Sequence, residues 1–409
     1  MRLFLFLSFL LIVDLYAFQA FKVLSQGWTR FPRISWMITY LVLSMIAYIY
    51  IIGSSNNWFE GLHKNVNIYM RAFVFILFFS KFFVALFVGI DDLRRLVLWI
   101  TGQFAATSSP NLSRSNFLAQ LGLVAGALPF VSLTYGILRN TYRYKLHRQP
   151  LRLKNLPPQL EGLRIVQISD VHSGSFTFKE PIRRGIEMIN ELEPDLVFFT
   201  GDLVNTHAAE MEPYTDVFDK IQAKHGVYSI LGNHDYGDYK SWPTHQDKQA
   251  NFAALKEVHE RMGWNLLLNE NRILDVNGSS LAVIGVENIS GSNRFVTYGD
   301  LKKAYAGSEH ADLKVLLSHD PSHWSSEVIH AFKDIQLTLS GHTHGFQFGI
   351  EIPGWVKWSP SKYVYKHWAG LYQQQDQHLY VNRGFGVLGY PGRVGILPEI
   401  TLLELEPTA

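Results

Sequence analysis

The sequence contains no cysteine among its 409 residues. Disulfide bonds and thiolate metal sites are therefore excluded, and any bound metal must be held by His, Asp, Asn or Glu. A strong charge of either sign is also lacking, because the net charge is +2. We therefore predict no binding to nucleic acids and no preference for acidic partners.

Apolar residues make up 47% of the chain, which is ordinary for a globular protein, but they are unevenly distributed. Residues 1–138 are rich in Leu, Ile, Val and Phe and contain four apolar segments. Each is close to the roughly 20 residues needed to cross a bilayer. These segments are Leu3–Phe21, Ile34–Gly53, Ile68–Ile90 and Phe117–Leu138. We predict a transmembrane anchor of four helices over residues 1–138.

The first apolar segment also has features of a secretory signal peptide, because Arg2 precedes a leucine-rich core. However, the apolar run continues past Asp14, no clear small-x-small cleavage site follows it, and three more segments come after it. We therefore expect this segment to be retained as a helix.

Three charged residues, Asp14, Arg71 and Lys81, lie in or near the apolar segments. A charge at membrane depth is a candidate for transport or proton relay. We favour a structural role, in which Arg71 reaches the membrane surface while Asp14 and Lys81 face other helices. The few polar residues in the segments argue against a transporter with a regulatory soluble domain.

Four crossings place both ends of the anchor on one side of the membrane. Lys and Arg residues on that side outnumber those in the opposite loops, so the positive-inside rule favours a cytoplasmic C-terminal part. Residues 139–158 are basic and contain proline without an apolar period. We predict a juxtamembrane linker there, whose Lys and Arg either contact anionic headgroups or simply flank the last helix.

From residue 159 onward the composition is that of a soluble domain, which we assign to residues 159–409. Apolar strands alternate with helices in its first part, a pattern that indicates a mixed α/β sheet. The predicted helices are Pro181–Leu192 and Glu212–Ala223. The predicted strands are Leu163–Ile168, Leu196–Thr200, Val227–Leu231, Leu281–Val286, Leu313–Leu317, Ile335–Leu339, Leu379–Asn382 and Ile400–Leu405.

Five of these strands run directly into residues of metal-binding types. In Asp-x-His and His-x-His, alternate side chains point the same way along an extended chain. Strand ends are also where open α/β sheets bind ligands. One such motif alone is weak evidence, but five segments of this kind in succession indicate a metal site. The segments are Asp170-Val171-His172, Gly201-Asp202, Gly232-Asn233-His234-Asp235, His319 and His342-Thr343-His344.

These blocks, over about residues 160–409, resemble the calcineurin-like metallophosphoesterases. The segments Ser340–Gln347, Asn382–Gly386 and Pro398–Ile400 are most similar to the membrane-anchored bacterial branch. Phe346 departs from that branch, which commonly has glycine there, and its bulk either narrows the pocket or adds an apolar surface. The resemblance implies an α/β fold, a four-layer αββα sandwich, preceded here by the four-helix transmembrane domain.

The resemblance also implies a site for two divalent metal ions. Asp170, His172 and His344 would hold one ion, Asn233, His319 and His342 would hold the other, and Asp202 would bridge them. Imidazole, carboxylate and amide ligands suit Mn, Fe or Zn. A hydroxide bridging two such ions would attack phosphorus.

Other residues near these motifs have two interpretations each. His234 is expected to be the general acid, as its equivalent is in the family, or else a structural histidine bonded to a backbone carbonyl. Asp235 either orients His234 or caps a helix. Arg383 and Arg393 either clamp phosphate or lie in surface or salt-bridged positions.

The stretch Gly349–Tyr372 is rich in aromatic residues, including Trp355, Trp358, Tyr363, Tyr365 and Trp368. Such residues suit a patch beside the membrane, a wall over an apolar substrate, or a packed lid over the metal pocket.

We therefore expect an integral protein of the inner or cell membrane that hydrolyses a phosphoester in a phosphate-containing small molecule or lipid-linked substrate. The alternatives are a lipid-linked pyrophosphatase that acts on a nucleotide-activated lipid precursor, and a scaffold that has lost its chemistry. A scaffold predicts missing ligands, and none are missing here.

Overall fold

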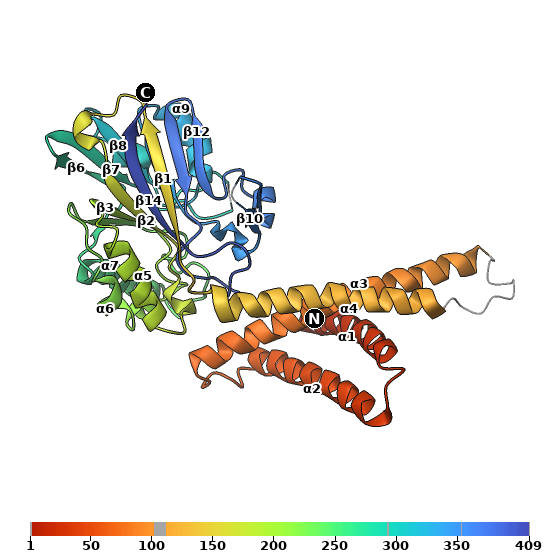
Figure 1. The fold of residues 1–409 in the computed structure, drawn as a ribbon. Coiled ribbons are helices and arrows are strands. Elements are labelled where there is room, and N and C mark those ends of the chain that lie inside the picture. Colours follow the sequence, from red (N-terminus) through yellow and green to blue (C-terminus); the bar gives the residue numbers. More distant parts are fainter. Residues whose placement is uncertain (1, 102–111, 293, 353, 409) are drawn as a thin grey trace. The chain divides into compact units, whose positions relative to one another are not determined.

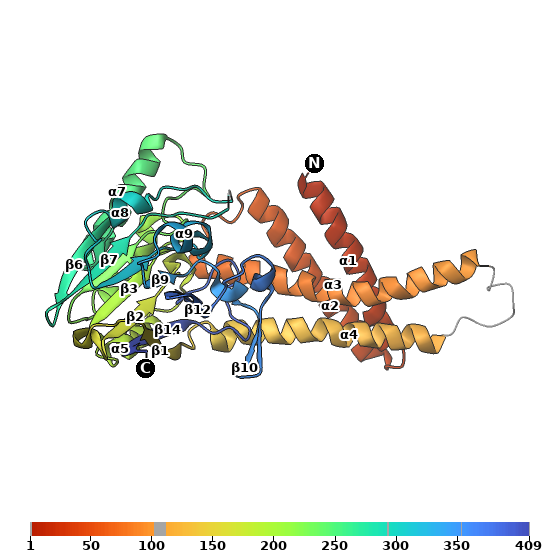
Figure 2. The same ribbon diagram turned by 90° about the horizontal axis from the view of Figure 1, so that it is seen from above.

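The computed structural model describes residues 2–101, 112–292, 294–352 and 354–408. The chain divides into two compact units, Met1–Gly136 and Ile137–Ala409, which we call the helical unit and the sheet unit. Figures 1 and 2 show long helices in the first unit and two stacked sheets in the second.

The helical unit contains α1 (Arg2–Leu24), α2 (Arg30–Ser55), α3 (Lys64–Ile100) and α4 (Leu112–Tyr135). All four are long and apolar enough to cross a membrane, which confirms the predicted segments. Two glycines one turn apart let α4 approach α3 closely. A Cβ on Gly122 would lie 3.2 Å from Val84 O, and a Cβ on Gly126 would lie 2.8 Å from Ser80 O. Small residues at this spacing are typical of helix contacts in membranes.

A buried ion pair joins three of these helices. Lys81 Nζ of α3 lies 2.5 Å from Asp14 Oδ1 of α1 and 2.6 Å from Ser44 Oγ of α2. Tyr40 of α2 also donates to Asp14 Oδ1 at 2.8 Å. Both charged side chains are buried, so the prediction that Asp14 and Lys81 face other helices is confirmed.

Lys81→Ala is expected to lower the free energy of unfolding by about 3–5 kcal/mol, because it leaves the Asp14 carboxylate buried and unpaired. Thermal and denaturant unfolding in detergent measure the loss. Removing both charges in Asp14→Asn/Lys81→Met should restore most of the stability. A double variant that is as unstable as Lys81→Ala would contradict the pairing.

The sheet unit contains two six-stranded sheets. The first has the strand order β1 (Lys145–Leu153), β14 (Glu399–Pro407), β2 (Arg164–Ile168), β3 (Leu196–Thr200), β4 (Val227–Ile230) and β5 (Asn265–Leu266). The second has the order β12 (Gly370–Gln374), β13 (Gln377–Val381), β9 (Leu337–Ser340), β8 (Leu313–Leu317), β7 (Ser279–Gly285) and β6 (Glu270–Val276). Strands β2 to β5 run parallel, as do β7, β8, β9 and β13.

Successive side chains of the central strands point to opposite faces of their sheet, so each strand contributes to two buried layers. Ile165, Phe198 and Val315 point between the sheets, where they belong to one buried cluster. Their neighbours Val166 and Phe199 point outward and pack beneath α5 (Glu180–Asn190), α6 (Thr215–Phe218) and α7 (His245–Arg261). Helices α8 (Leu301–Tyr305) and α9 (Ile329–Ala331) cover the outer face of the second sheet. The predicted αββα sandwich is confirmed.

Two segments differ from the sequence-based expectation. Residues 139–158, predicted as a linker, contain β1, which pairs in parallel with β14 and buries Leu151 and Leu153. As an edge strand β1 tolerates Pro150, which lacks a backbone donor. The predicted helix Glu212–Ala223 is reduced to the short helix α6, Thr215–Phe218.

Candidate metal centre

The five predicted motif blocks meet at one edge of the sandwich. Each follows the carboxyl end of a parallel strand: β2, β3 and β4 in the first sheet, and β8 and β9 in the second. Parallel neighbours in each sheet therefore deliver their polar residues to the same edge.

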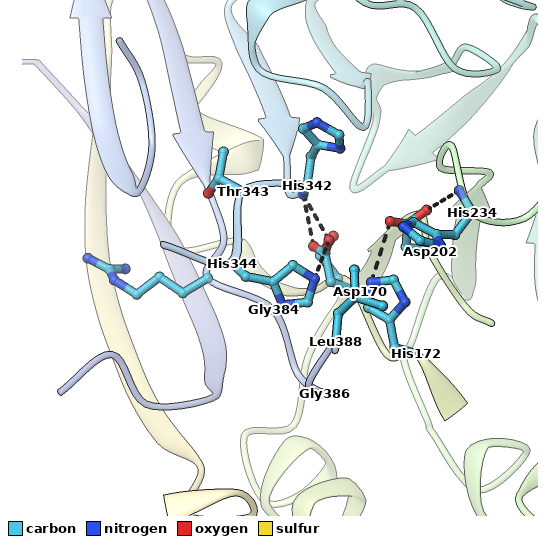
Figure 3. A network of polar contacts seen from close by, with 12 residues as sticks. Asp170, His172, Asp202, His234, His342, Thr343, His344, Gly384, Gly386 and Leu388 are labelled. Carbon is cyan, nitrogen blue, oxygen red and sulfur yellow. Dashed lines mark hydrogen bonds and ion pairs between the residues drawn. The ribbon is translucent and has the colours of Figure 1, made fainter. Parts of the chain in front are cut away.

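The blocks supply two groups of side chains that could each hold a metal ion. One group is Asp170, His172 and His344, and the other is Asp202, His319 and His342. Within each group the ligand atoms lie within 4.8 Å of one another. Figure 3 shows the Asp170 and Asp202 carboxylates with the surrounding histidines.

Asp202 contacts members of both groups. Its Oδ2 lies 3.5 Å from His172 Nε2 and 3.2 Å from His319 Nε2. In the first group, Asp170 Oδ1 lies 3.2 Å from His344 Nε2. In the second, His319 Nε2 lies 3.2 Å from His342 Nδ1. Asp202 therefore links the two groups.

Backbone strain accompanies these residues. Asp170, His172, Asp202, His342 and His344 all have positive φ, between 46° and 72°. This region is unfavourable for residues with a side chain, at about 1 kcal/mol or more each, and such strain concentrates at functional sites. Hydrogen bonds between the loops offset this strain. The His342 N–H donates to both Asp170 carboxylate oxygens at 3.0 Å, and the His172 N–H donates to Asp202 O at 3.1 Å.

Two glycines of the motifs are required because their Cα atoms lie close to the carboxylates of the site. A Cβ on Gly232 would lie 2.2 Å from Asp202 Oδ1, and one on Gly341 would lie 2.2 Å from Asp170 Oδ2. Any side chain at these positions would displace a carboxylate.

The charges of the site fit cation ligands. Burial raises the pKa of Asp202, but the nearby histidines, His319 foremost, outweigh it and hold that pKa well below its usual value. Burial keeps the pKa of His172 well below its usual value. For His319, burial opposes protonation, yet the Asp202 carboxylate raises its pKa to about 10. Metal binding requires ionised carboxylates and neutral imidazoles, and a cation would replace the His319 proton.

The hydrogen bonds also fit bound metal. His319 Nδ1 donates to Thr200 O at 2.7 Å, which aims Nε2 at Asp202, as outer partners do for metal-binding histidines. Within the described part of the chain, His172 makes no hydrogen bond at either ring nitrogen, and Asn233 Oδ1 is likewise buried without a partner. Buried polar atoms are rarely left unpaired, so these donor atoms suit metal coordination.

His234 lies beside the two groups and borders the adjoining cavity. Its Nδ1 donates to Asn205 O at 2.9 Å, and its backbone N–H donates to Asp202 Oδ1 at 2.9 Å. The predicted carbonyl contact is therefore present at one ring nitrogen. The other ring nitrogen has no comparable bond among the described residues.

Asp235 makes different contacts from the two predicted. Its fully buried carboxylate accepts backbone N–H groups from Asp202, Leu203 and Gly232 at 2.9 Å and from Val204 at 3.2 Å. It thus joins the loop after β3 to the loop after β4 and makes no side-chain bond to His234. Burial, followed by the charge of Asp202, raises the pKa of Asp235 to about 7.

Asp235→Ala is expected to lower the free energy of unfolding by about 3 kcal/mol, because several buried N–H groups lose their acceptor. Denaturant unfolding measures this loss. Asp312→Ala, in which an exposed aspartate that also accepts a backbone N–H is removed, is the control and should cost less. Equal losses would show that Asp235 does not organise the two loops.

Neither arginine considered as a phosphate clamp lines the adjoining cavity, although Arg393 Nη2 lies 3.4 Å from His344 Nδ1. Arg383 is buried and paired with Glu399 and Glu351, at 2.6 and 2.5 Å. Arg393 is fully buried and donates to the backbone carbonyls of Gly384 and Gly386. For Arg383, the sequence-based alternative to a phosphate clamp, a salt-bridged position, is therefore correct.

A cavity of about 490 Å³ adjoins the metal-binding groups, and several phenylalanine and tyrosine side chains contribute to its lining. Two tyrosines in it also contact the proposed ligands: Tyr239 Oη accepts from Asn233 Nδ2 at 2.7 Å, and Tyr365 Oη lies 2.9 Å from His342 Nε2. The contact between Tyr239 and Asn233 was not predicted, and no motif spacing marks Tyr239. The aromatic and aliphatic lining residues are Tyr239, Phe295, Phe346, Tyr365, Leu388 and Tyr390.

The comparison with known families agrees with this geometry. Residues 163–346 match the family described as calcineurin-like phosphoesterase, and residues 1–141 match a probable calcineurin-like phosphoesterase transmembrane domain. The chain belongs to the calcineurin-like metallophosphoesterases. Membership implies hydrolysis of phosphoric esters with the help of divalent metal ions.

Relatives of this metallophosphoesterase occur in animals and bacteria. A transmembrane protein with metallophosphoesterase domain from Bos taurus is 27% identical over 79% of this chain and 70% of its own length. The uncharacterized metallophosphoesterase YkuE of Bacillus subtilis is 29% identical over 73% of this chain and 99% of its own. An uncharacterized metallophosphoesterase of Helicobacter pylori is 24% identical over 98% of both chains.

Proposed function

We propose that this membrane metallophosphoesterase is a dinuclear hydrolase. Asp170, His172 and His344 hold one divalent ion, and Asn233, His319 and His342 hold the second. Asp202 serves both ions, and its contacts with both ligand groups are the observation that carries the proposal. A scaffold is disfavoured, because the seven proposed ligands are present and converge at one edge of the sandwich.

Two divalent ions supply Lewis acidity toward the phosphoryl oxygens and a water-derived nucleophile at neutral pH. The chain's residues do the rest. The aromatic cavity takes the remainder of the substrate and limits the access of water. His234, positioned by Asn205 O, donates a proton from its pocket-facing nitrogen to the leaving oxygen.

The test is metal reconstitution of the full-length protein. After chelation, activity toward an aryl phosphodiester should fall to background and return with Mn, Fe or Zn, and a panel of mono-, di- and pyrophosphate substrates assigns the bond type. Activity that survives complete metal removal would refute the proposal.

A lipid-linked pyrophosphate substrate is the second candidate, and the cavity supports it. The described residues that line the cavity include no lysine or arginine, and the wall outside the metal-binding motifs is formed mainly by aromatic and aliphatic side chains. Such a wall suits an apolar substituent better than a highly charged small metabolite. Hydrolysis of a nucleotide-activated lipid in nanodiscs should then exceed hydrolysis of a soluble diester, whereas preference for the soluble compound would argue against this candidate.

We also propose that the protein resides in the inner or cell membrane with the sheet unit in the cytoplasm. The Lys and Arg bias of the flanking segments supports this orientation. A reporter fused after Ala409 that functions only in the cytoplasm should be active, and activity of a reporter that requires export would reverse the assignment.

A further inference from the structure

The hairpin formed by β10 (Ile350–Ile352) and β11 (Val356–Trp358) belongs to neither six-stranded sheet. Its register pairs Ile350 with Trp358 and Ile352 with Val356. Directly opposed residues in an antiparallel pair share a face, and neighbours along a strand alternate. One face is therefore wholly apolar, and the other carries Glu351 and Lys357.

The two side chains on the polar face of the hairpin form hydrogen bonds with the rest of the sheet unit. Glu351 Oε1 accepts from Arg383 Nη2 at 2.5 Å, and Arg383 is only 3% exposed. Lys357 Nζ donates to the carbonyl of buried Ala369 at 2.5 Å. Meanwhile Ile350 and Ile352 on the apolar face are 52% and 43% exposed. An antiparallel sheet with one solvent-exposed face normally presents polar side chains to water, whereas this hairpin exposes Ile350 and Ile352 in addition to Lys357.

The exposed apolar area extends beyond the two strands. We call Phe348, Ile350, Ile352, Trp355 and Tyr363 the hairpin surface; Trp355 and Tyr363 are 80% and 74% exposed. Exposed large apolar side chains at neighbouring positions of the chain are candidates for an interaction site. Trp and Tyr are the residues enriched where proteins meet the membrane–water interface.

The charges around the hairpin surface suit an anionic membrane. Lys362 and Lys366 are exposed. The single acidic residue of residues 346–366 is Glu351, which is neutralised by Arg383. Basic side chains next to an apolar surface are attracted to anionic headgroups.

Within the sheet unit, the base of the hairpin lies close to the residues that follow α4 in the sequence. Five residues lead from Tyr135, the end of α4, to Asn140, and they span at most about 18 Å. The Asn140 side chain donates to Arg393 O at 3.0 Å, and the next residue, Val394, accepts from Gly349 N at 2.9 Å. Gly349 directly precedes β10. The loop that contains Arg393 and Val394 therefore contacts both the start of the hairpin and the short segment that follows α4.

We propose that the hairpin surface inserts into the headgroup region of the bilayer that the protein spans, and so holds the sheet unit against the membrane. Figure 2 shows the hairpin projecting from the two six-stranded sheets, as such insertion requires. Phe346, which lines the catalytic cavity and is 46% exposed, lies two residues before the hairpin surface. Insertion therefore brings the cavity close to the lipid headgroups.

The test uses the full-length chain, whose lack of cysteine permits labelling at one introduced site. Ile352→Cys carries a polarity-sensitive fluorophore in nanodiscs of phosphatidylcholine and phosphatidylglycerol with doxyl-labelled lipid. Ile273→Cys is the matched control, because Ile273 lies in a strand of the same unit and is 48% exposed. We expect blue-shifted emission and strong quenching by the doxyl lipid at position 352 only.

Two results would overturn the proposal. Quenching by aqueous iodide as strong at position 352 as at position 273 would mean that the hairpin surface faces water. Shielding from iodide without doxyl quenching would mean that protein covers it, either the helical unit or a second copy. Trp355→Cys provides a second label at the hairpin tip if Ile352→Cys folds poorly. Neither readout depends on hydrolysis, so the result is separate from the outcome for the proposed activity.

Discussion

Asp202→Asn is expected to abolish metal-dependent hydrolysis while leaving the fold intact. The substitution keeps the shape of the side chain and an oxygen able to accept the His234 N–H at Oδ1. It removes the charge and the second carboxylate oxygen, which contacts His172 and His319. Loss of a residue that merely supports a ligand costs about 10–100-fold in metal affinity or activity, so loss of a ligand shared by two ions should cost more.

A matched control for this experiment lies at the opposite end of the same strand. Asp195 precedes β3, whereas Asp202 follows it, and Asp195 Oδ2 accepts the Arg164 N–H at 2.8 Å far from the metal-binding edge. Asp195→Asn should retain both metal content and turnover. Metal analysis, circular dichroism and a phosphodiester assay are made on both variants. Full turnover in Asp202→Asn would refute the shared-ligand role.

Most of the architecture could be predicted because the central strands are short, apolar and bounded by turns. Leu196–Thr200 and Leu313–Leu317 were predicted with the bounds that the structure shows. Their residues are buried on both faces, so hydrophobicity alone marks them. The motif blocks were predictable for a related reason, since each directly follows such a strand.

Strand β1 could not be predicted in the same way. Its sequence holds Pro150 and several basic residues, and only Leu151 and Leu153 are fully buried. Its partner β14 is more than 240 residues away in sequence, at Glu399–Pro407. An edge strand needs pairing on one side only, so a local apolar pattern is not required.

Within the site, the ligand types were predictable but the supporting contacts were not. The sequence suggests that Asp235 orients His234 or caps a helix, yet its carboxylate accepts four backbone N–H groups from two loops. Tyr239 contacts Asn233 from within the same loop after β4, and Tyr365 contacts His342 from a different loop. Such contacts depend on how the loops fold back, and no periodicity in the sequence records that.

His234→Ala is expected to lower turnover by about 10²–10⁴-fold when the leaving group is an alkoxide, the usual contribution of a general acid. With p-nitrophenolate, which leaves without a proton, the loss should be far smaller. Metal content should stay unchanged, because the proposed ligand groups do not include this side chain.

The dependence on the leaving group separates proton donation from a structural role for His234. The Nδ1 contact with Asn205 O is present in either case, so geometry at that nitrogen does not distinguish them. A structural histidine would slow both substrates alike, because disorder of the loop after β4 would displace Asn233 regardless of the leaving group. His310→Ala, at an exposed histidine of the same unit, should leave both rates unchanged. Equal losses in His234→Ala, or loss of metal, would assign the residue to holding the loop or the ions instead of to proton transfer.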